Sequence, residues 1–266
     1  MAGAGNDFII VEAPKGVSLK SLARQVCDRT HGVGADGLLI LSKSRTADYR
    51  MRIINADGSI AEMCGNGARC LAAYIARHKK PKKKRFSLET QAGIILAEAQ
   101  GEKATVKLTD PKDYCCRMPL SVKGLNRHVD YLDTGVPHTI VYVNGLDHID
   151  VRAIGKTIRF HRQFSPRGTN VNFVEPVSST LIRVRTYERG VEDETRACGT
   201  GSVAAAIAAY RIMNPQRQND TNARMKVKTT SGEVLAITFD ITNGRITNVW
   251  LRGSAKFIAE GKYYYR

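Results

Sequence analysis

The sequence predicts an α/β protein built from two similar halves. The motif Cys64–Ala68 (CGNGA) reappears as Cys198–Ser202 (CGTGS), an offset of 134 residues (198 − 64), and each copy leads into an alanine-rich stretch. Gly34–Asp36 matches Gly168–Asn170 at the same offset. Short runs rich in β-branched residues surround both copies. A repeat of this kind indicates that one structural unit occurs twice in the chain.

The same order of elements is predicted in both halves: a strand, a helix, two strands, the Cys-Gly-x-Gly turn, a second helix and a hairpin. Leu19, Leu22 and Val26 follow helical spacing, and Ser18 precedes them as an N-cap. The helix after the second motif must stop before Pro215. The predicted strands are the runs 8–11, 38–41, 49–54, 140–143, 171–174 and 181–186.

The repeat also predicts the domain organisation. The first domain is expected to cover 1–117 together with a returning tail at 253–266, in which residues 255–259 form a closing strand. The second domain is expected to cover 118–252. The strand-like run 129–132 has no counterpart in the first half, so the first half is predicted to lack its opening strand.

Composition narrows the class of protein. The chain has 266 residues, 42% of them hydrophobic and 25% charged, which is typical of a globular protein and excludes a largely disordered one. No apolar run reaches the ~18 residues of a membrane helix, and the start lacks a basic and apolar signal segment, so we expect neither a membrane partner nor secretion. Six cysteines without a Cys-x-x-C pair favour a reduced, cytoplasmic protein with no bound metal.

The charge is strongly basic. There are 41 Lys and Arg residues against 25 Asp and Glu, a formal charge of +16, and part of the excess lies in the run Lys79–Arg85. A basic excess is typical of proteins that meet anionic molecules. No aromatic residues interleave with these lysines, so base stacking is not indicated and no nucleic-acid partner is predicted. We expect the run to be a solvated loop between a helix and a strand.

The two cysteines of the repeated motif are the candidate catalytic groups. Cys64 and Cys198 each stand where a loop turns into a helix, and the first amides and the dipole of a helix favour a thiolate there. The free amides at the same place can bind a carboxylate. Two buried structural cysteines are the alternative, since free Cys is often buried, but this alternative does not explain the duplicated motif.

Two such groups on opposite sides of one molecule would invert a stereocentre. A single base returns a proton to the face from which it came, whereas two opposed groups remove it from one face and deliver it to the other. The amides at the helix starts would stabilise the negative charge that develops when an α-proton leaves.

Three further stretches give a resemblance to a known family. Over its whole length the chain resembles the diaminopimelate epimerases. The stretches that carry the resemblance are Gly3–Phe8, Asn55–Ser59 leading to Glu62–Gly67, and Tyr187–Val191 leading to Ala197–Gly201.

The resemblance implies a fold and an activity. The fold is two pseudo-symmetric α/β (α+β) domains, each a sheet wrapped round a central helix, with the active site in the cleft between them. The activity is the interconversion of L,L- and meso-diaminopimelate on the route to lysine and peptidoglycan. It needs no cofactor, neither pyridoxal phosphate nor metal, and members are usually homodimers.

The resemblance also implies roles for individual residues. Cys64 and Cys198 would be the two acid/base residues, and His138 would support them. The α-carboxylate would be held by the amides of Gly65, Asn66, Gly199 and Thr200. The distal amino-acid end of the substrate, which needs both a carboxylate and a guanidinium, would be held by Asn6, Asn55, Asn170, Glu188 and Arg189.

The chain departs from the family pattern in three places. It has fewer residues before the first glycine motif. Gly37 and Val136 stand where some members carry a glutamine and an asparagine. The stretch Gly190–Thr195 is one residue longer than the commonest form. None of these departures touches the two cysteines.

Two rival functions remain open. A proline-racemase-type enzyme shares the two-cysteine chemistry, but it expects a histidine where Asn66 stands and a proline where Ala197 stands, and it needs no distal clamp. A non-enzymatic basic binding protein is suggested only by the charge of +16 and would bind nucleic acid in a salt-dependent way.

Overall fold

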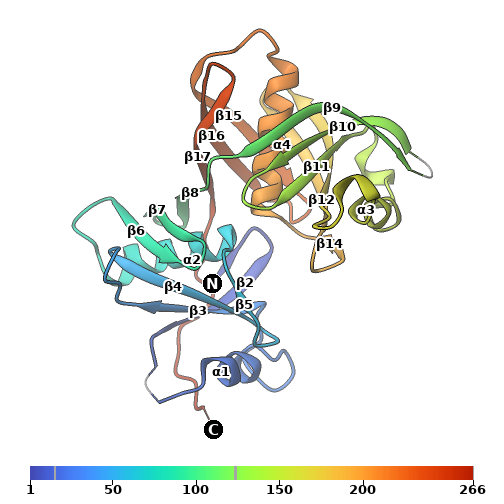
Figure 1. The fold of residues 1–266 in the computed structure, drawn as a ribbon. Helices are drawn as coiled ribbons and strands as arrows, with labels where there is room; N and C mark the ends of the chain where they lie inside the picture. The colour runs from blue at the N-terminus through green and yellow to red at the C-terminus, as the bar shows by residue number, and fades with distance from the viewer. Residues whose placement is uncertain (15, 123–124, 266) are drawn as a thin grey trace. The chain divides into compact units, whose positions relative to one another are not determined.

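The computed structural model describes residues 1–14, 16–122 and 125–265. The chain divides into two compact units (Figure 1): unit 1 comprises Met1–Lys107 with Arg252–Arg266, and unit 2 comprises Leu108–Leu251. The first boundary lies ahead of the expected one at 117/118. The reason is that strand β9 (Lys112–Val122) pairs along its length with β10 (Leu125–Asp133) of unit 2.

Unit 1 is a sheet with the strand order β1-β2-β3-β4-β6-β7-β8. The β2–β3 and β4–β6 pairs are parallel, the other neighbours are antiparallel, and β5 adds to β4 in the antiparallel sense. The strands are β1 (Ala2–Gly3), β2 (Asn6–Glu12), β3 (Gly37–Ser42), β4 (Tyr49–Asn55), β5 (Ile60–Ala61), β6 (Arg85–Thr90), β7 (Gly93–Gln100) and β8 (Lys103–Lys107).

Unit 2 has the order β9-β10-β11-β12-β13-β15-β16-β17. Here β11–β12 and β13–β15 are the parallel pairs, and β14 adds to β13 in the antiparallel sense. The remaining strands of this unit are β11 (Pro137–Tyr142), β12 (Asn170–Ser178), β13 (Leu181–Glu188), β14 (Asp193–Thr195), β15 (Asp220–Thr229), β16 (Val234–Thr242) and β17 (Arg245–Ser254), whose end belongs to unit 1.

The two units repeat one pattern of strand pairing, which confirms the internal repeat. The strands β2, β3, β4, β5 and β6 correspond to β11, β12, β13, β14 and β15, with parallel and antiparallel neighbours at the same places. The two-residue β1 pairs with β2 as the long β10 pairs with β11. The opening strand of the first half is therefore reduced to two residues rather than missing.

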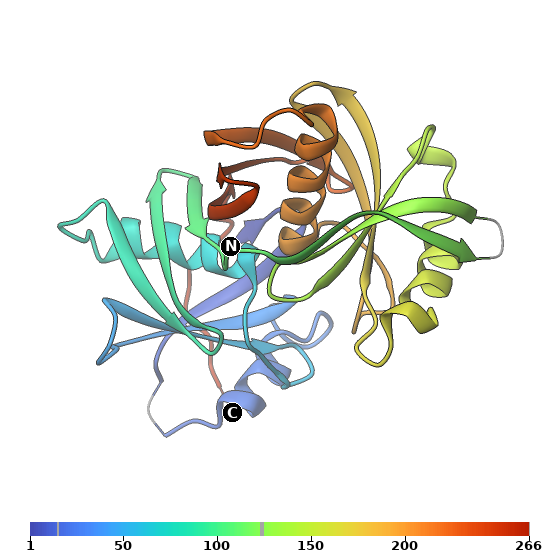
Figure 2. The ribbon, with the colours of Figure 1, turned by 45° about the horizontal axis from the view of Figure 1, so that its top comes forward.

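Each unit is organised around one long helix, α2 (Gly65–His78) in unit 1 and α4 (Gly199–Met213) in unit 2 (Figure 2). Both are rich in alanine, which favours the helix and keeps it thin enough for strands to approach on several sides. Ten consecutive residues of α4, from Gly201 to Tyr210, are buried. The helix ends at Met213, as the following Pro215 predicts. The expected α/β fold, with a sheet around a central helix in each half, is confirmed.

The shorter helices α1 (Leu19–Val26) and α3 (Val151–Arg159) occupy equivalent places and start from side-chain caps. The Ser18 hydroxyl accepts a hydrogen bond from the amide of Ser21 at 3.4 Å, as predicted for an N-cap, and Asp150 accepts one from Ala153 at 3.0 Å. Gly155 brings α3 directly onto β13, since a Cβ there would lie 2.5 Å from Cβ of Tyr187.

A β-bulge interrupts strand β9. Val129 pairs with Met118 and Tyr131 with Cys115, so three steps along β9 face two steps along β10. At the bulge, successive side chains of β9 no longer point to opposite faces of the strand. As a result the neighbouring side chains of Cys115 and Cys116 are both exposed.

The C-terminal tail and the basic run Lys79–Arg85 lie at the predicted positions, but the predicted strand in the tail does not form in full. The tail returns to unit 1, but the predicted closing strand at 255–259 is reduced to a single bridge between Ala2 and Lys256. The basic run connects the end of α2 to β6, and its residues Lys82–Lys84 are exposed, as expected for a solvated loop. In the described part of the chain, no helix has the length and apolar character needed to cross a bilayer.

Gly155→Ala tests the contact between α3 and β13. The added methyl has no room beside Tyr187, so we expect the free energy of unfolding to fall by about 1–3 kcal/mol, measured by urea denaturation. Lys156→Ala, at the next and exposed position, is the control and should change it by less than about 0.5 kcal/mol. Equal stability of the two variants would contradict this packing.

Candidate active site

Cys64 is the N-cap of α2. Its backbone is extended (φ −144°, ψ 114°), and its Sγ accepts a hydrogen bond from the amide of Gly67 at 3.4 Å. The thiol therefore points toward the first turn of the helix, as the motif predicts. Gly67 permits this arrangement, because a Cβ at that position would lie 3.0 Å from Cδ2 of Leu39 on the underlying strand β3.

Cys198 is the N-cap of α4 in the same backbone conformation (φ −110°, ψ 116°). Its Sγ lies 3.5 Å from the hydroxyl of Thr200, and the residue is only 7% exposed. Gly201 repeats the role of Gly67 more tightly: a Cβ there would lie 2.3 Å from Oδ1 of Asn172 on β12 and 3.3 Å from Cβ of Cys198.

The first turns of both helices are suited to an anion. Gly65 and Asn66 open α2, and Gly199 and Thr200 open α4, so their amides have no acceptor within the helix. Neither helix has an acidic residue in its first turn, where the helix dipole would favour one. A carboxylate from another molecule can therefore take that place.

In unit 1, a chain of polar side chains runs from α2 to Asp36, the residue that precedes β3. The buried guanidinium of Arg69 donates to Oδ1 of Asn66 at 2.8 Å, and Nδ2 of Asn66 donates to Oδ1 of Asn6 at 2.7 Å. Nδ2 of Asn6 donates in turn to Asp36 at 2.9 Å. Asn6 and Asn66 are thus brought together and held in one orientation by groups on both sides.

Asp36 is itself fixed by a charged partner. Arg29 donates to both Asp36 and Asp7, at 2.7 and 2.8 Å, so one guanidinium joins the two carboxylates. Its proximity lowers the pKa of Asp7 from the usual value. Asn55, the remaining predicted residue of this unit, lies apart from this chain at the exposed end of β4, where it donates to the hydroxyl of Ser59 at 2.9 Å.

In unit 2, the side chain of Asn170 connects the start of β11 to Arg189, which follows β13. Its Nδ2 donates to the carbonyl of Pro137 at the start of β11, and its Oδ1 accepts from the amide of Arg189 at 2.9 Å. The side chain of Arg189 donates to the carbonyl of Arg167 at 3.1 Å. The structure therefore brings Asn170 and Arg189 together at one edge of the unit.

Glu188 ends strand β13 immediately before this turn. Gly190 follows with φ +92°, the left-handed conformation that lets the chain reverse after two adjacent candidate site residues. Burial raises the pKa of Glu188, and the hydroxyl of Thr195, which donates to its Oε2 at 2.8 Å, partly offsets that effect. Glu188 therefore holds its proton more readily than an ordinary glutamate does.

His138 is completely buried at the start of β11. Burial, and after it the positive charge of Arg189, lowers the pKa of the ring to about 3, so the imidazole is neutral at physiological pH. Its Nδ1 lies 3.2 Å from Nδ2 of Asn172. The predicted supporting histidine is thus tied to the strand that lies under Gly201 and Cys198.

Arg69, Asp36 and Asn172 were not predicted from the sequence as members of these networks. Two signals were present. Arg69 is a charged residue in an otherwise small and apolar helix segment, three positions after Asn66, which places both on one helix face. Asn172 follows Asn170 by two positions in a strand, so their side chains share a face.

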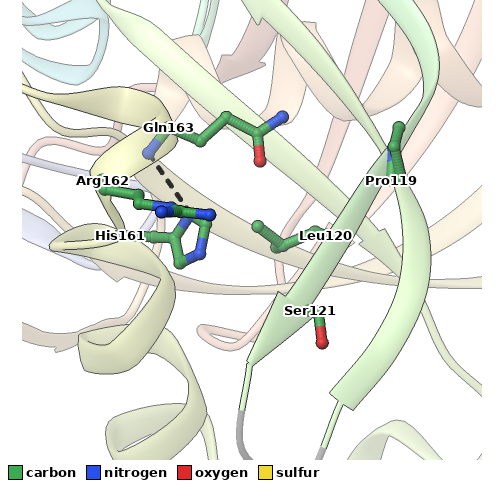
Figure 3. Close-up of a pocket in the computed structure, with 6 residues that line it drawn as sticks. All are labelled: Pro119, Leu120, Ser121, His161, Arg162 and Gln163. Atoms are coloured by element: carbon green, nitrogen blue, oxygen red, sulfur yellow. Dashed lines mark hydrogen bonds between the residues drawn. The ribbon is translucent and has the colours of Figure 1, made fainter.

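A separate hollow of about 500 Å³ lies elsewhere in unit 2, between the β9–β10 ribbon and the segment after α3 (Figure 3). None of the predicted site residues lines it. Its lining residues are Pro119, Leu120, Ser121, His161, Arg162 and Gln163. Across the described residues, no three His, Cys, Asp or Glu side chains are grouped closely enough to hold a metal ion.

Asn66→Ala tests the polar chain of unit 1. The substitution removes the acceptor of Arg69 Nη2 and the donor to Asn6, so we expect the free energy of unfolding to fall by about 1–3 kcal/mol, measured by urea denaturation. Asn55→Ala, at the exposed asparagine, should cost less than about 0.5 kcal/mol. A similar loss in both variants would show that the chain does not hold Asn66 in place.

The model of the family described as diaminopimelate epimerase matches residues 1–113 and 131–258. The diaminopimelate epimerase of Chlorobaculum tepidum is 41% identical over 98% of this chain and 98% of its own length. That of Aquifex aeolicus is also 41% identical, over 98% of this chain and 95% of its own.

Solved structures show the same fold at much lower identity. A phenazine biosynthesis protein of the PhzF family from Bacillus anthracis has a TM-score of 0.71 at 19% identity, covering 96% of this chain and 92% of its own. A probable proline racemase from Agrobacterium radiobacter has a TM-score of 0.68 at 16% identity, covering 95% and 88%. On the evidence of the sequence matches along nearly its whole length, this chain belongs to the diaminopimelate epimerase family.

Proposed function

We propose that the protein is a cofactor-independent epimerase that interconverts L,L- and meso-diaminopimelate, with Cys64 and Cys198 as its two acid/base groups. The observation that carries the proposal is the equivalence of these cysteines. Each is the N-cap of the central helix in one of two repeated units, and each precedes a glycine that lets the helix start lie directly on the sheet. Relatives named diaminopimelate epimerase support the choice of substrate.

The proposed reaction is a transfer of the α-proton between two sulfurs. The thiolate of one cysteine takes the proton from the α-carbon, and the electron pair left behind is delocalised into the adjacent carboxylate. The thiol of the other cysteine then gives its proton to the opposite face of that carbon. One thiolate and one thiol have exchanged roles at the end, so the next turnover runs in the reverse sense or follows proton exchange with solvent.

The helix starts supply the electrostatic part of the proposal. The amides of Gly65, Asn66, Gly199 and Thr200 would bind the α-carboxylate, on which negative charge increases as the proton leaves. The absence of acidic residues from both first turns supports this assignment. Neutral His138, buried in unit 2, would support the cysteines as a hydrogen-bonding group rather than as a cation.

The distal end of diaminopimelate carries both an ammonium and a carboxylate. Arg189 suits the carboxylate, since a guanidinium can donate to both of its oxygens, and Glu188 suits the ammonium. Asn6, Asn55 and Asn170 would complete the contacts. In this proposal, residues from both halves of the repeat contact one substrate molecule.

The family resemblance also supports a proposal for the enzyme's cofactor use, oligomeric state, location and pathway. The enzyme would act without pyridoxal phosphate or metal, as a homodimer in the cytoplasm, in the biosynthesis of lysine and of peptidoglycan precursors. It would have no nucleic-acid or membrane partner.

Incubation of the purified protein with L,L-diaminopimelate in heavy water tests the reaction. We expect deuterium at the α-position, detected by mass spectrometry without any added cofactor, because the proton passes through exchangeable thiols. Cys64→Ala and Cys198→Ala should each abolish epimerisation, since each removes one of the two proton carriers. Cys116→Ala, which removes an exposed thiol of β9, is the control and should retain full activity. Full activity in either of the first two variants would refute the two-cysteine mechanism.

Arg189→Lys tests recognition of the distal end. The substitution keeps the charge but loses the paired donors, so kcat/KM for diaminopimelate should fall at least about tenfold, equivalent to about 1.4 kcal/mol. Arg167→Lys is the control: this arginine is exposed and pairs with Asp133, so its kcat/KM should stay within about twofold of the wild-type value. Proline should not be racemised measurably. Racemisation of proline at a comparable rate would favour the proline-racemase alternative.

A further inference from the structure

Three polar side chains form a buried cluster behind the start of α4. His138 on β11, Asn172 on β12 and Thr186 on β13 are at most 4% exposed. Nδ2 of Asn172 lies 3.2 Å from Nδ1 of His138 and donates to the carbonyl of Thr139 at 3.2 Å, while its Oδ1 accepts from the hydroxyl of Thr186 at 3.0 Å. Asn172 therefore joins three neighbouring strands with one amide.

The same three positions in unit 1 are apolar. Leu39 takes the place of Asn172, since each lies under the equivalent glycine of its central helix. Leu39 pairs with Ile53 as Asn172 pairs with Thr186. The unit 1 residue that is equivalent to His138 follows from the pairing register of the strands.

That register relates β2 to β11. Phe8 lies two positions before the residue that pairs with Leu39, as His138 lies two positions before the residue that pairs with Asn172. Phe8, Leu39 and Ile53 are all buried. One copy of the fold is thus built with hydrocarbon at these positions, so the fold itself does not require the polar cluster of unit 2.

The hydrogen bonds fix the orientation of the Asn172 amide. The carbonyl of Thr139 can only accept, so the nitrogen of the amide must face it, and the second N–H of that nitrogen faces Nδ1 of His138. Nδ1 must then accept. Because a neutral imidazole carries one proton, that proton is on Nε2.

The Nε2 atom of His138 is fully buried and has no hydrogen-bond partner among the described residues. Burying a donor without an acceptor is unfavourable, so the cost of this buried N–H calls for an explanation, of which a catalytic role is one. The orphaned atom points to an acceptor that arrives with the reaction: a carboxylate of the substrate or a thiolate.

Asn172 also contacts the catalytic turn. Its Oδ1 occupies the space that a Cβ of Gly201 would take, 2.3 Å from that position, and Cβ of Cys198 lies 3.3 Å from the same point. One side chain therefore touches the helix start that carries Cys198 and the ring of His138.

We propose that Asn172 is a positioning residue of the site: it holds His138 in the tautomer with the proton on Nε2, as a donor to an anion, and it seats the turn that carries Cys198. The identity of that anion rests on the proposed function. The assignment of the tautomer rests only on the hydrogen bonds of unit 2.

The tautomer is tested on the wild-type enzyme by two-bond ¹H–¹⁵N NMR of ring-labelled histidine, with the His138 signals assigned by their loss in His138→Gln. We expect the Nε2–H pattern at pH 7. An Nδ1–H pattern, or a doubly protonated ring, in the wild-type enzyme would overturn the proposal.

Asn172→Asp and Thr186→Val form a matched pair. A carboxylate at 172 can only accept, so the proton should move to Nδ1, kcat should fall about tenfold or more, and KM should change less than about twofold. Thr186→Val removes one hydrogen bond of the same cluster but leaves both N–H groups of Asn172 in place. It should lower the melting temperature yet keep the Nε2–H pattern and a kcat within about twofold of wild type.

The outcomes separate this inference from the proposed function. An unchanged tautomer in Asn172→Asp, or an equal loss of kcat in both variants, would reduce Asn172 to a packing residue and overturn the proposal. Absence of α-deuteration in the wild type would contradict the proposed function, and the NMR pattern of wild type and Asn172→Asp would still decide the tautomer assignment.

Discussion

The close contact between each central helix start and the sheet beneath it is the constraint on which the rest of the molecule depends. Gly67 and Gly201 stand at the third helical position after the capping cysteine, and in both cases a Cβ would meet the neighbouring strand. At Gly201 an added Cβ has no room, 2.3 Å from Oδ1 of Asn172, and at Gly67 it would press on the Leu39 side chain at 3.0 Å. The contact fixes where the thiol and the first amides of each helix lie relative to the strands, so the chemistry of the motif follows from packing.

The sequence was sufficient to predict the repeat, most strands and the helix caps, because these depend on local patterns. Leu19, Leu22 and Val26 form one face of α1, and Ser18 caps it, as their spacing and type require. Pro215 sets the limit of α4 in the same local way. The predicted closing strand at 255–259 was too long. The tail pairs with β1, and β1 has only two residues, so only the bridge between Ala2 and Lys256 forms.

The polar networks could not be predicted to the same degree, because they depend on which residues face each other across strands. Asn172 meets His138 and Thr186 only in the observed register of β11, β12 and β13. Arg69 reaches Asn66 within one helix, but Asn66 meets Asn6 across 60 positions of sequence. The sequence does identify Asn6 and Asn66 as polar members of family motifs. Only the fold shows that each holds the other in place.

The β-bulge of β9 has a practical consequence for cysteine chemistry on this protein. It leaves two adjacent sulfurs, Cys115 and Cys116, open to solvent, whereas Cys27 and Cys70 are buried and the pKa of Cys27 is raised to about 11. Alkylating reagents and oxidants will therefore meet this strand first, and bulk titration of thiols will report on a surface ribbon rather than on the helix caps. Two copies of the chain could also be joined through these sulfurs during storage in air. A background in which Cys115 and Cys116 are replaced by serine would give thiol measurements that refer to the capping cysteines.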